Sequence, residues 1–322
     1  MKIKGLLILV LLIAVSAGFV EGEFNLTYSF SGDMTMSVEV DGIEREYFVH
    51  IPEGYNSEEL FPVVFVLHGG GGNAEKLGRY TGFTELSDQE KFIVVYPQGY
   101  NRNWNDGRTD IKSKAHEENI NDIKFFNEMI KALNLLFKID ESRIYAVGIS
   151  NGAMMSFRIA CELSDKFAAI AAVAGSCPEE LSECTPENPI SILIINGTDD
   201  PLVPFHGGNV KVFKKTRGKI LSTMETIKKF VLHNECGIKP VNFYNIDTVK
   251  DDEMIVRVQE YKNEKTGVEV VLYKIEGGGH TWPGKKQYAP KFMIGKTNRD
   301  IDATEVIWNF FKNKKLQTIE NE

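Results

Sequence analysis

The stretch that most constrains this fold is RIYAVGISNGAMMSFR, residues 143–158. Its first part is a short apolar run that predicts a buried parallel strand, and its last part has the period of an α-helix. Between the two, Gly148, Ser150 and Gly152 follow the spacing G-x-S-x-G. Small residues are needed there because a tight turn brings the strand end against the first helical turn, where a side chain would collide. The segment therefore predicts a nucleophile elbow, with the hydroxyl of Ser150 at the start of a helix.

Two backbone amides are predicted to stabilise a negatively charged oxygen beside this serine. One is the N–H of Asn151, because it lies at the helix N-terminus directly after the nucleophile. The other is expected in the glycine run of VVFVLHGGGGN, an apolar strand that begins after Pro62. A phosphate-binding loop is the alternative, but the G-K-[ST] signature is missing and the Rossmann spacing fits poorly. We predict the N–H of Gly70 as the second donor, with His68 packed beneath the loop in a structural role.

A serine hydroxyl is a weak nucleophile unless a base removes its proton and a carboxylate orients that base. In α/β-hydrolases the acid follows the serine in the chain, and the histidine follows the acid. The segment INGTDDPLVP comes directly after the apolar strand 190–195, so its carboxylates should lie at the same sheet edge as Ser150. Asp199 and Asp200 both fit by position. We choose Asp200, because Pro201 fixes the turn after it.

Three histidines follow this acid, and one of them suits the role of the base. His206 is too near to Asp200 in the chain to reach back over the serine, and His233 ends an amphipathic helix. His280 lies in the glycine-flanked loop EGGGHTWPG after the strand 268–275, so we predict it as the general base. The alternative is a zinc site, which lacks HExxH-like spacing and would use Asp199, Asp200, His206 and His280.

The remaining segments predict an α/β fold in which helices cover both faces of a mostly parallel central sheet. The strands are nearly unbroken apolar runs that alternate with helices, which is typical of such a sheet. Segments 37–40 and 46–51 alternate in polarity around Asp41–Gly42 and predict an antiparallel N-terminal edge. A second hairpin, formed by 255–261 and 268–275, either projects over the sheet or extends it.

The N-terminal segment predicts export from the cytoplasm. Two lysines precede an apolar run, 6–15, that is too short for a comfortable membrane span and is followed by small residues. We predict a secretory signal over residues 1–17, with Gly22 as a later alternative end, and hence a secreted protein. After the signal we expect a single catalytic domain, 37–313, and a polar tail, 314–322.

Trp104 has two interpretations from its own context, the polar loop QGYNRNWNDGRTD at 98–110. A tryptophan among asparagines fits an aromatic wall of an acyl pocket, and it equally fits a ring that packs the loop onto the core.

Four motifs in order, HGGGGN, GISNGAMM, NGTDDPLVPF and GGGHTWPG, resemble those of the polyhydroxybutyrate-depolymerase-like secreted esterases. These are relatives of the feruloyl and acetylxylan esterases of carbohydrate esterase family one. The similarity extends from about Arg45 to Phe311. The resemblance implies an α/β-hydrolase fold and a mechanism that needs no metal or organic cofactor. It also implies the triad Ser150, Asp200 and His280, the oxyanion donors Gly70 and Asn151, and two tryptophans that border the substrate cleft, Trp104 and Trp282.

Export permits disulfides, and the chain has four cysteines. Four cysteines allow three complete pairings, and their spacing does not choose among them. Cys177 and Cys184 lie in one loop, so one prediction is a local bridge between them. Free buried thiols are the alternative, because the spacing matches no C-x-x-C metal or redox pattern. The resemblance adds that Cys236 matches a position often bridged to a cysteine in the following hairpin. Because that hairpin has no cysteine here, Cys236 is predicted to be unpaired.

Together these features predict a secreted serine carboxylic-ester hydrolase. A net charge of −8 argues against a nucleic-acid partner, because no basic face is present to neutralise phosphates. We favour feruloyl or acetyl esters of plant polysaccharides as substrates, since no polymer-binding segment is evident after Phe311. The enzymatic alternatives are a depolymerase of polyhydroxybutyrate-type or other polyesters and a peptidase. The non-enzymatic alternative is an exported binding protein on a hydrolase scaffold.

Overall fold

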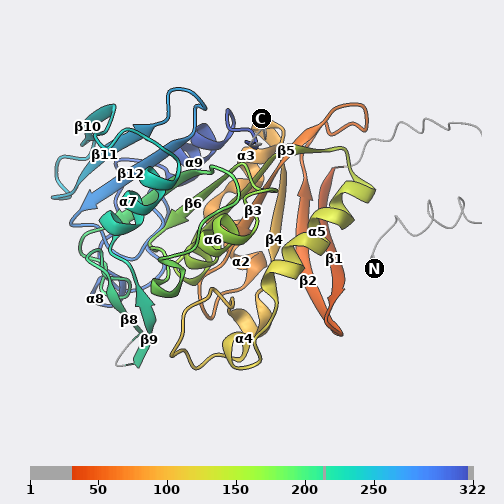
Figure 1. Cartoon of the computed structure of the whole chain (residues 1–322), viewed down its shortest axis with the longest axis horizontal. Helices are drawn as coiled ribbons and strands as arrows, with labels where there is room; N and C mark the ends of the chain where they lie inside the picture. The colour runs from red at the N-terminus through yellow and green to blue at the C-terminus, as the bar shows by residue number, and fades with distance from the viewer. Residues whose placement is uncertain (1–30, 213–214, 318–322) are drawn as a thin grey trace, which may run out of the picture.

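The computed structural model describes residues 31–212 and 215–317, so the predicted secretory signal lies outside the described residues. Ten strands form one sheet across the molecule (Figure 1). In the order in which they pair, they are β1 (Gly32–Val40), β2 (Ile43–Ile51), β4 (Ile93–Pro97), β3 (Phe61–Leu67), β5 (Ile139–Ile149), β6 (Ala169–Val173), β7 (Ser191–Gly197), β12 (Glu269–Glu276), β11 (Ile255–Lys262) and β10 (Asn242–Ile246).

The centre of the sheet is parallel and both of its edges are antiparallel. All neighbours from β4 across to β12 pair in parallel. At one edge β1 and β2 form the hairpin predicted around Asp41–Gly42, and β2 pairs antiparallel with β4. At the other edge, the second predicted hairpin extends the sheet, because β12 pairs with β7 and β11 pairs with β12. The sequence did not predict β10, which pairs antiparallel with β11 at the far edge.

Helices cover both faces of the sheet, as predicted, and each face has its own apolar core. Along β3, Val63, Phe65 and Leu67 face one core, while Val64 and Val66 face the other. The first core includes side chains of α5 (Asp122–Leu136), α6 (Asn151–Glu162) and α7 (Thr223–His233), which Figure 1 shows in front of the sheet. The second core includes side chains of α2 (Ala74–Thr81), α3 (Phe83–Glu90) and α9 (Ala303–Phe311). Burial on both faces explains why the central strands lack polar alternation.

The C-terminal ends of the parallel strands bring the predicted site segments to one edge of the sheet. The glycine loop follows β3, Ser150 follows β5, Asp200 lies just after β7, and His280 lies just after β12. These strands are adjacent or separated by one strand in the sheet. Ligands in open α/β sheets bind at this edge, outside the carboxyl ends of the strands.

A small two-stranded sheet stands apart from the main one and was not predicted. It consists of β8 (Gly208–Val212) and β9 (Lys215–Ile220), which lie low in Figure 1, below α7. Val210 and Ile220 pack with Met154 of α6, so the hairpin is attached close to the nucleophile elbow. The remaining short elements are η1 (Tyr100–Arg102), α4 (Lys114–Glu117), η2 (Glu179–Leu181) and α8 (Lys291–Ile294).

The chain after α9 is still attached to the domain, beyond the predicted boundary at 313. The hydroxyl of Tyr145 donates to the carbonyl of Lys314 at 2.6 Å, and the N–H of Leu316 donates to the carbonyl of Ser142 at 2.8 Å. Within the described ranges, no helix is long and apolar enough to cross a membrane.

The cysteine pairing differs from the local bridge suggested by the sequence. Cys161, in α6, forms a disulfide with Cys184, and Cys177 is free and buried. The prediction of a bridge between Cys177 and Cys184 was therefore wrong, because the fold brings α6 beside the loop that contains Cys184. Cys236 is also free and buried, which confirms its predicted unpaired state.

Candidate active site

Ser150 occupies the strained turn that the G-x-S-x-G spacing predicts. Its backbone has φ 58° and ψ −120°, a left-handed conformation that residues with a side chain rarely adopt. The turn is held on one side by the N–H of Ser150, which donates to the carbonyl of Val173 in β6 at 3.0 Å. Its own carbonyl accepts from the N–H of Met154 in the first turn of α6. The serine hydroxyl is therefore presented at the sheet edge by fixed backbone.

The two glycines of the motif are required for close approach. A Cβ atom at Gly148 would lie 2.2 Å from the carbonyl carbon of Gly152, and one at Gly152 would lie 2.4 Å from the carbonyl oxygen of Leu67. Both distances are far inside van der Waals contact, so the structure confirms the predicted collision. The glycines let β3, β5 and α6 meet at a single point beneath Ser150.

Asp200 and His280 are joined by a hydrogen bond of 2.7 Å from imidazole Nδ1 to the Oδ2 atom of the carboxylate. The other oxygen of Asp200 accepts from the N–H groups of Leu202 and Val203, both at 2.8 Å. The carboxylate is therefore fixed from two sides, and both it and the imidazole are buried. Because the carboxylate can only accept, Nδ1 carries the proton and Nε2 is left as the basic nitrogen.

The other acid that fitted by position is placed differently. Asp199 is exposed and accepts a hydrogen bond from the hydroxyl of Thr198 at 2.9 Å. His206 is also exposed, with its ring against Phe205. The residues considered for a zinc site are thus divided between a buried pair and the protein surface. Among the described residues, no group of three or more histidine, cysteine or acidic side chains is arranged to hold a metal ion.

Ser150 and His280 line the same cavity, which has a volume of about 930 Å³. Asn151 and the glycine loop 69–72 line it as well, so every predicted catalytic element except the buried Asp200 reaches this space. Part of its wall is apolar and includes Leu202, Val210, Val212, Met293 and Ile294. None of these five was predicted from the sequence to lie at the site, because they come from short segments without a distinctive pattern.

The two predicted oxyanion donors lie next to each other and are free to bind. A Cβ atom at Gly70 would lie 3.7 Å from the Cβ atom of Asn151. In the same loop, the N–H groups of Gly71 and Gly72 donate to the carbonyls of Arg102 and Gly69. Within the described chain, the amides of Gly70 and Asn151 have no acceptor, which suits a pair of donors kept for a ligand oxygen.

His68 lies beneath the glycine loop as a neutral, fully bonded side chain. Its Nε2 atom accepts from the N–H of Gly99 at 2.9 Å, and its Nδ1 atom donates to the carbonyl of Gly69 at 2.8 Å. Burial is the main reason that the pKa of His68 falls to about 4. The nearby charge of Arg102 acts in the same direction, and the hydrogen bond to the carbonyl of Gly69 opposes both. A ring with both nitrogens engaged and so low a pKa is suited to holding the loop, in line with its predicted structural role.

A buried carboxylate, which was not predicted from the sequence, holds the residue after the nucleophile. The Nδ2 atom of Asn151 donates to the Oδ2 atom of Asp106 at 2.6 Å. Burial alone would raise the pKa of Asp106, but the Arg108 guanidinium at 2.7 Å and a hydrogen bond from His116 hold it below its ordinary value. Asp106 lies in an irregular polar loop, where no periodicity distinguishes a buried aspartate from a solvated one.

Both tryptophans predicted to border the cleft are instead buried in the core, so that prediction was wrong. Trp104 is 0% exposed; its indole N–H donates to the carbonyl of His68 at 2.8 Å, and its ring packs near Phe126. Trp282 is also 0% exposed and donates to the hydroxyl of Thr304 at 3.1 Å. Neither ring lines the cavity, because each loop folds its large apolar side chain inward.

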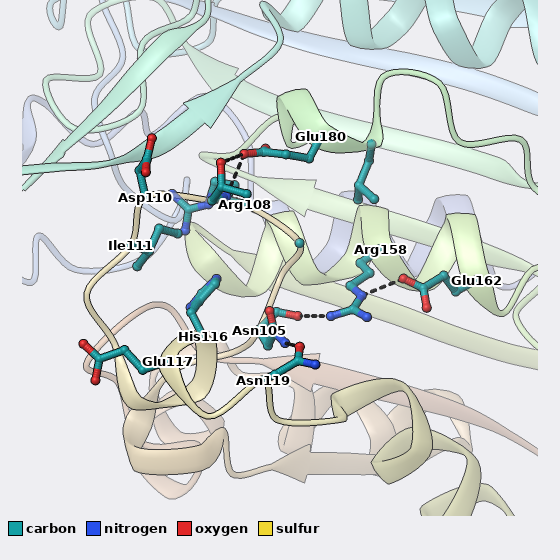
Figure 2. Close-up of a pocket in the computed structure, with 13 residues that line it drawn as sticks. Asn105, Arg108, Asp110, Ile111, His116, Glu117, Asn119, Arg158, Glu162 and Glu180 are labelled. Carbon is teal, nitrogen blue, oxygen red and sulfur yellow. Dashed lines mark hydrogen bonds and ion pairs between the residues drawn. The ribbon is translucent and has the colours of Figure 1, made fainter.

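A second, polar cavity of about 560 Å³ adjoins the first (Figure 2). The two share Arg108, Ile111, His116 and Glu117 in their walls. Figure 2 shows Arg158 between Glu162 and the backbone of Asn105. Its guanidinium donates to the carboxylate of Glu162 at 2.6 Å and to the carbonyl of Asn105 at 2.7 Å.

Comparison with known proteins identifies the family. A family model described as "Putative esterase" matches residues 39–284, which is most of the chain. The chain belongs to this esterase family. It is accordingly a carboxylic ester hydrolase.

Several curated relatives of this esterase have names that agree with the family. "Putative esterase NocK" of Nocardia uniformis subsp. tsuyamanensis is 30% identical over 283 residues, which cover 85% of this chain and 80% of that protein. "Feruloyl esterase B" of Piromyces equi is 28% identical over 76% of this chain and 45% of that protein. "Probable feruloyl esterase C" of Aspergillus terreus is 30% identical over 60% of this chain and 63% of that protein. The matched region of this esterase thus spans about half to two thirds of both feruloyl esterases.

Solved structures support the fold of this esterase. The acetyl xylan esterase from Aspergillus awamori aligns with a TM-score of 0.52 and 15% identity, over 77% of this chain and 94% of that chain. An S-formylglutathione hydrolase from Agrobacterium tumefaciens aligns with a TM-score of 0.50 and 14% identity, over 80% of this chain and 92% of that chain. At such low identity these likenesses bear on fold alone, and the predicted α/β-hydrolase fold is confirmed.

Proposed function

We propose that this esterase cleaves its substrate through an acyl-enzyme formed on Ser150. His280 takes the proton of the serine hydroxyl as Ser150 attacks the ester carbonyl, and then gives it to the departing alcohol. Water then enters and attacks the acyl carbonyl while His280 takes one of its protons. That proton passes to the oxygen of Ser150 as the bond between the serine and the acyl group breaks and the acid is released. Asp200 keeps the imidazole in the tautomer that this sequence of steps requires. The observation that carries the proposal is the hydrogen bond between Asp200 and His280 beside a cavity that Ser150 also lines.

The amides of Gly70 and Asn151 serve as the oxyanion hole in this proposal. Negative charge develops on the carbonyl oxygen during the attack, and fixed N–H donors stabilise it without reorganisation. Support comes from the adjacency of these two residues and from the absence of any acceptor for either amide within the described chain. Asp106 contributes indirectly, because it holds the side chain of Asn151 in place.

We assign feruloyl or acetyl esters of plant polysaccharides as the substrate class. The names of the relatives support this choice, since two are feruloyl esterases and one structural neighbour is an acetyl xylan esterase. The cavity is also large enough for an aromatic acyl group. Tyr80 and Tyr288 both line it, with their rings 6.0 Å apart in an edge-to-face arrangement. Such a pair offers an aromatic surface on which a feruloyl ring can pack.

We further propose that the protein works outside the cytoplasm. The predicted signal over residues 1–17 motivates this, and the disulfide between Cys161 and Cys184 supports it, because such bonds persist in oxidising compartments. Intact mass and N-terminal sequencing of protein recovered outside the cytoplasm should give a chain that begins at Gly18. A chain that retains Met1 would contradict the proposal.

The test of the catalytic assignment is Ser150→Ala. Hydrolysis of p-nitrophenyl acetate and methyl ferulate should fall to background, and a fluorophosphonate probe should no longer label the protein. The matched control is Ser182→Ala, in the loop after η2, which does not line the cavity and should keep both properties. A Ser150→Ala variant that still turns over either ester would rule out the serine mechanism. A panel of methyl ferulate, acetylated xylan and hydroxybutyrate oligomers then tests the substrate class.

A further inference from the structure

The cavity that contains Ser150 is rich in positive charge, although the whole chain has a net charge of −8. One carboxylate, that of Glu117, lines it. Six cationic side chains line it: Lys76, Arg102, Arg108, Lys112, Lys114 and Arg217. An acidic protein that gathers cations around its nucleophile has a local field opposite in sign to its overall charge.

Two of these six cations are neutralised by neighbours. Arg108 forms a buried ion pair with Asp106 at 2.7 Å, and Lys114 lies 3.4 Å from a carboxylate oxygen of Glu118 and 4.0 Å from one of Glu117. The other four have no ion-pair partner anywhere in residues 31–212 and 215–317. We call them the rim cations: Lys76, Arg102, Lys112 and Arg217.

The two arginines among the rim cations are held in place by backbone groups. The Nε atom of Arg102 donates to the carbonyl of Gly72 at 3.0 Å, and an Nη atom of Arg217 donates to the carbonyl of Lys112 at 2.9 Å. One hydrogen bond fixes each guanidinium and leaves its other N–H groups available. A planar guanidinium with free N–H groups matches the geometry of a carboxylate, and holding it in advance lowers the cost of binding.

Arg102 is also tied to the catalytic loop. Its carbonyl accepts from the N–H of Gly71 at 2.7 Å, and its backbone has φ 64°, a strained conformation for a residue with a side chain. Strain of this kind persists where the surrounding structure enforces it, and it is common at functional sites. The backbone and the guanidinium of Arg102 are therefore both bonded to the glycine loop that contains Gly70.

The acidic groups in this region lie around the neighbouring cavity instead. Four carboxylates line that cavity: Asp110, Glu117, Glu162 and Glu180 (Figure 2). Three of these are engaged, because Glu117 lies 4.0 Å from Lys114, Glu162 pairs with Arg158, and Glu180 accepts from the N–H of Thr109. Arg108 and Arg158 also line this neighbouring cavity, so its charges are mixed. The cavity that contains Ser150 has one carboxylate against six cations, and an anion is favoured there.

We propose that this esterase selects esters that carry a carboxylate, and that Arg102 and Arg217 bind that carboxylate while the apolar wall receives the uncharged part. The inference rests on the proposed serine esterase function and narrows its substrate class. Two natural sources supply the same chemistry: a uronic acid on an acetylated or feruloylated polysaccharide, and the free acid end of a hydroxyacid oligomer.

The first experiment compares esters of similar size that differ in charge, with each rate divided by the rate of uncatalysed hydrolysis of the same ester. On the alcohol side the pair is 4-carboxyphenyl acetate and 4-carbamoylphenyl acetate, and on the acyl side it is mono-p-nitrophenyl adipate and its methyl ester. An exposed ion pair strengthens binding by up to about fivefold in the equilibrium constant. Two arginines should therefore give the anionic member of at least one pair an advantage in kcat/KM of about tenfold. The advantage should shrink at about 0.5 M salt, where exposed charges are screened.

The second experiment removes the charge while keeping a hydrogen-bonding side chain. Arg102→Gln and Arg217→Gln should each reduce the preference for the anionic ester, measured as the ratio of kcat/KM for the anionic ester to kcat/KM for the neutral ester, by about threefold to fivefold. Arg102→Lys should keep part of the preference. The matched control is Arg79→Gln, because Arg79 lies on α2 near Lys76 but does not line the cavity.

The outcomes separate this inference from the function on which it rests. Wild-type protein that hydrolyses both members of each pair equally would overturn the inference and leave the serine esterase intact. Equal losses on both esters in the glutamine variants would also overturn it, since the arginines would then be structural. Wild-type protein that hydrolyses none of the four esters would contradict the proposed function itself. Two further comparisons of kcat/KM identify which natural source is preferred. One compares acetylated xylooligosaccharides that carry glucuronate with neutral ones, and the other compares hydroxybutyrate trimer with its methyl ester.

Discussion

At Asp200 both carboxylate oxygens are engaged, one by His280 and the other by two backbone N–H groups. Asp200→Asn should keep the size of the side chain but present an N–H to the imidazole, which would favour the wrong tautomer. We expect kcat for p-nitrophenyl acetate to fall by about 10³-fold to 10⁴-fold, with a small change in KM. Asp199→Asn is the matched control, because Asp199 is exposed and bonded to Thr198, and it should stay within about twofold of wild type. Equal losses in the two variants would contradict the assignment of Asp200.

His68 makes the stability of the fold depend on pH. Burial lowers its pKa from 6.5 to about 4, so between these values the unfolded chain binds a proton that the folded chain excludes. Acidification through this window should therefore destabilise the protein, by up to about 3 kcal/mol, while above pH 6.5 this histidine contributes no pH dependence. Urea unfolding at about pH 7.5 and about pH 4.5 measures the loss. In His68→Gln the loss should be about 2–3 kcal/mol smaller than in wild type, and an unchanged loss would refute the argument.

At the residue scale, the sequence predicted the positions of side chains whose chemical role requires a particular neighbour. It did not predict the positions of side chains that are placed by packing alone. Asp200 and His280 could be chosen because a serine nucleophile needs an acid and a base in a known chain order. The exposure of Trp104 could not be inferred in the same way, because a polar loop is able to fold its one large apolar ring either toward the core or toward solvent. The same ambiguity hid Asp106, whose burial depends on Arg108 and His116 meeting it in three dimensions.

At the level of elements, the junction of β3, β5 and α6 tolerates no side chain at Gly148 or Gly152. Gly148→Ala should prevent the accumulation of soluble, active protein, because its Cβ atom would lie 2.2 Å from the carbonyl carbon of Gly152. Gly237→Ala is the control: its Cβ atom would meet nothing nearer than 3.7 Å, so the midpoint of thermal unfolding should change little. Soluble expression and thermal unfolding measure both variants. A Gly148→Ala protein with wild-type stability would mean that the strand and helix can separate at this point.

Elements with a strong pattern were predicted closely, and those without one were missed. Helix α7 ends at His233, as predicted, and begins at a capping box formed by Ser222 and Glu225. The parallel strands were predictable because burial on both faces leaves long apolar runs. The hairpin of β8 and β9 was missed because its segment, 208–220, is largely polar and includes several lysines. Its position depends on contacts with α6 that are distant in sequence.

For the whole molecule, the cysteine pairing predicts the number of free thiols. Without reductant, the denatured protein should show two free thiols, from Cys177 and Cys236, and after reduction it should show four. Replacing Cys161 and Cys184 by serine should lower the free energy of unfolding by about 3 kcal/mol, since the bridge closes a loop with a sequence separation of 23. Thiol titration and urea unfolding measure the two effects. Four free thiols before reduction would contradict the pairing.

The hairpin of β8 and β9 shapes the cavity without belonging to the sheet that carries Ser150, Asp200 and His280. It supplies Val210, Val212 and Arg217 to the wall, and it could change in length or charge without moving the strands that hold the catalytic groups. Surface connections of this kind accept insertions and substitutions more readily than buried strands. During evolution, the substrate specificity of such an enzyme can therefore change while its catalytic mechanism stays the same. Homologues that share the mechanism should differ most in sequence and length in the hairpin of β8 and β9.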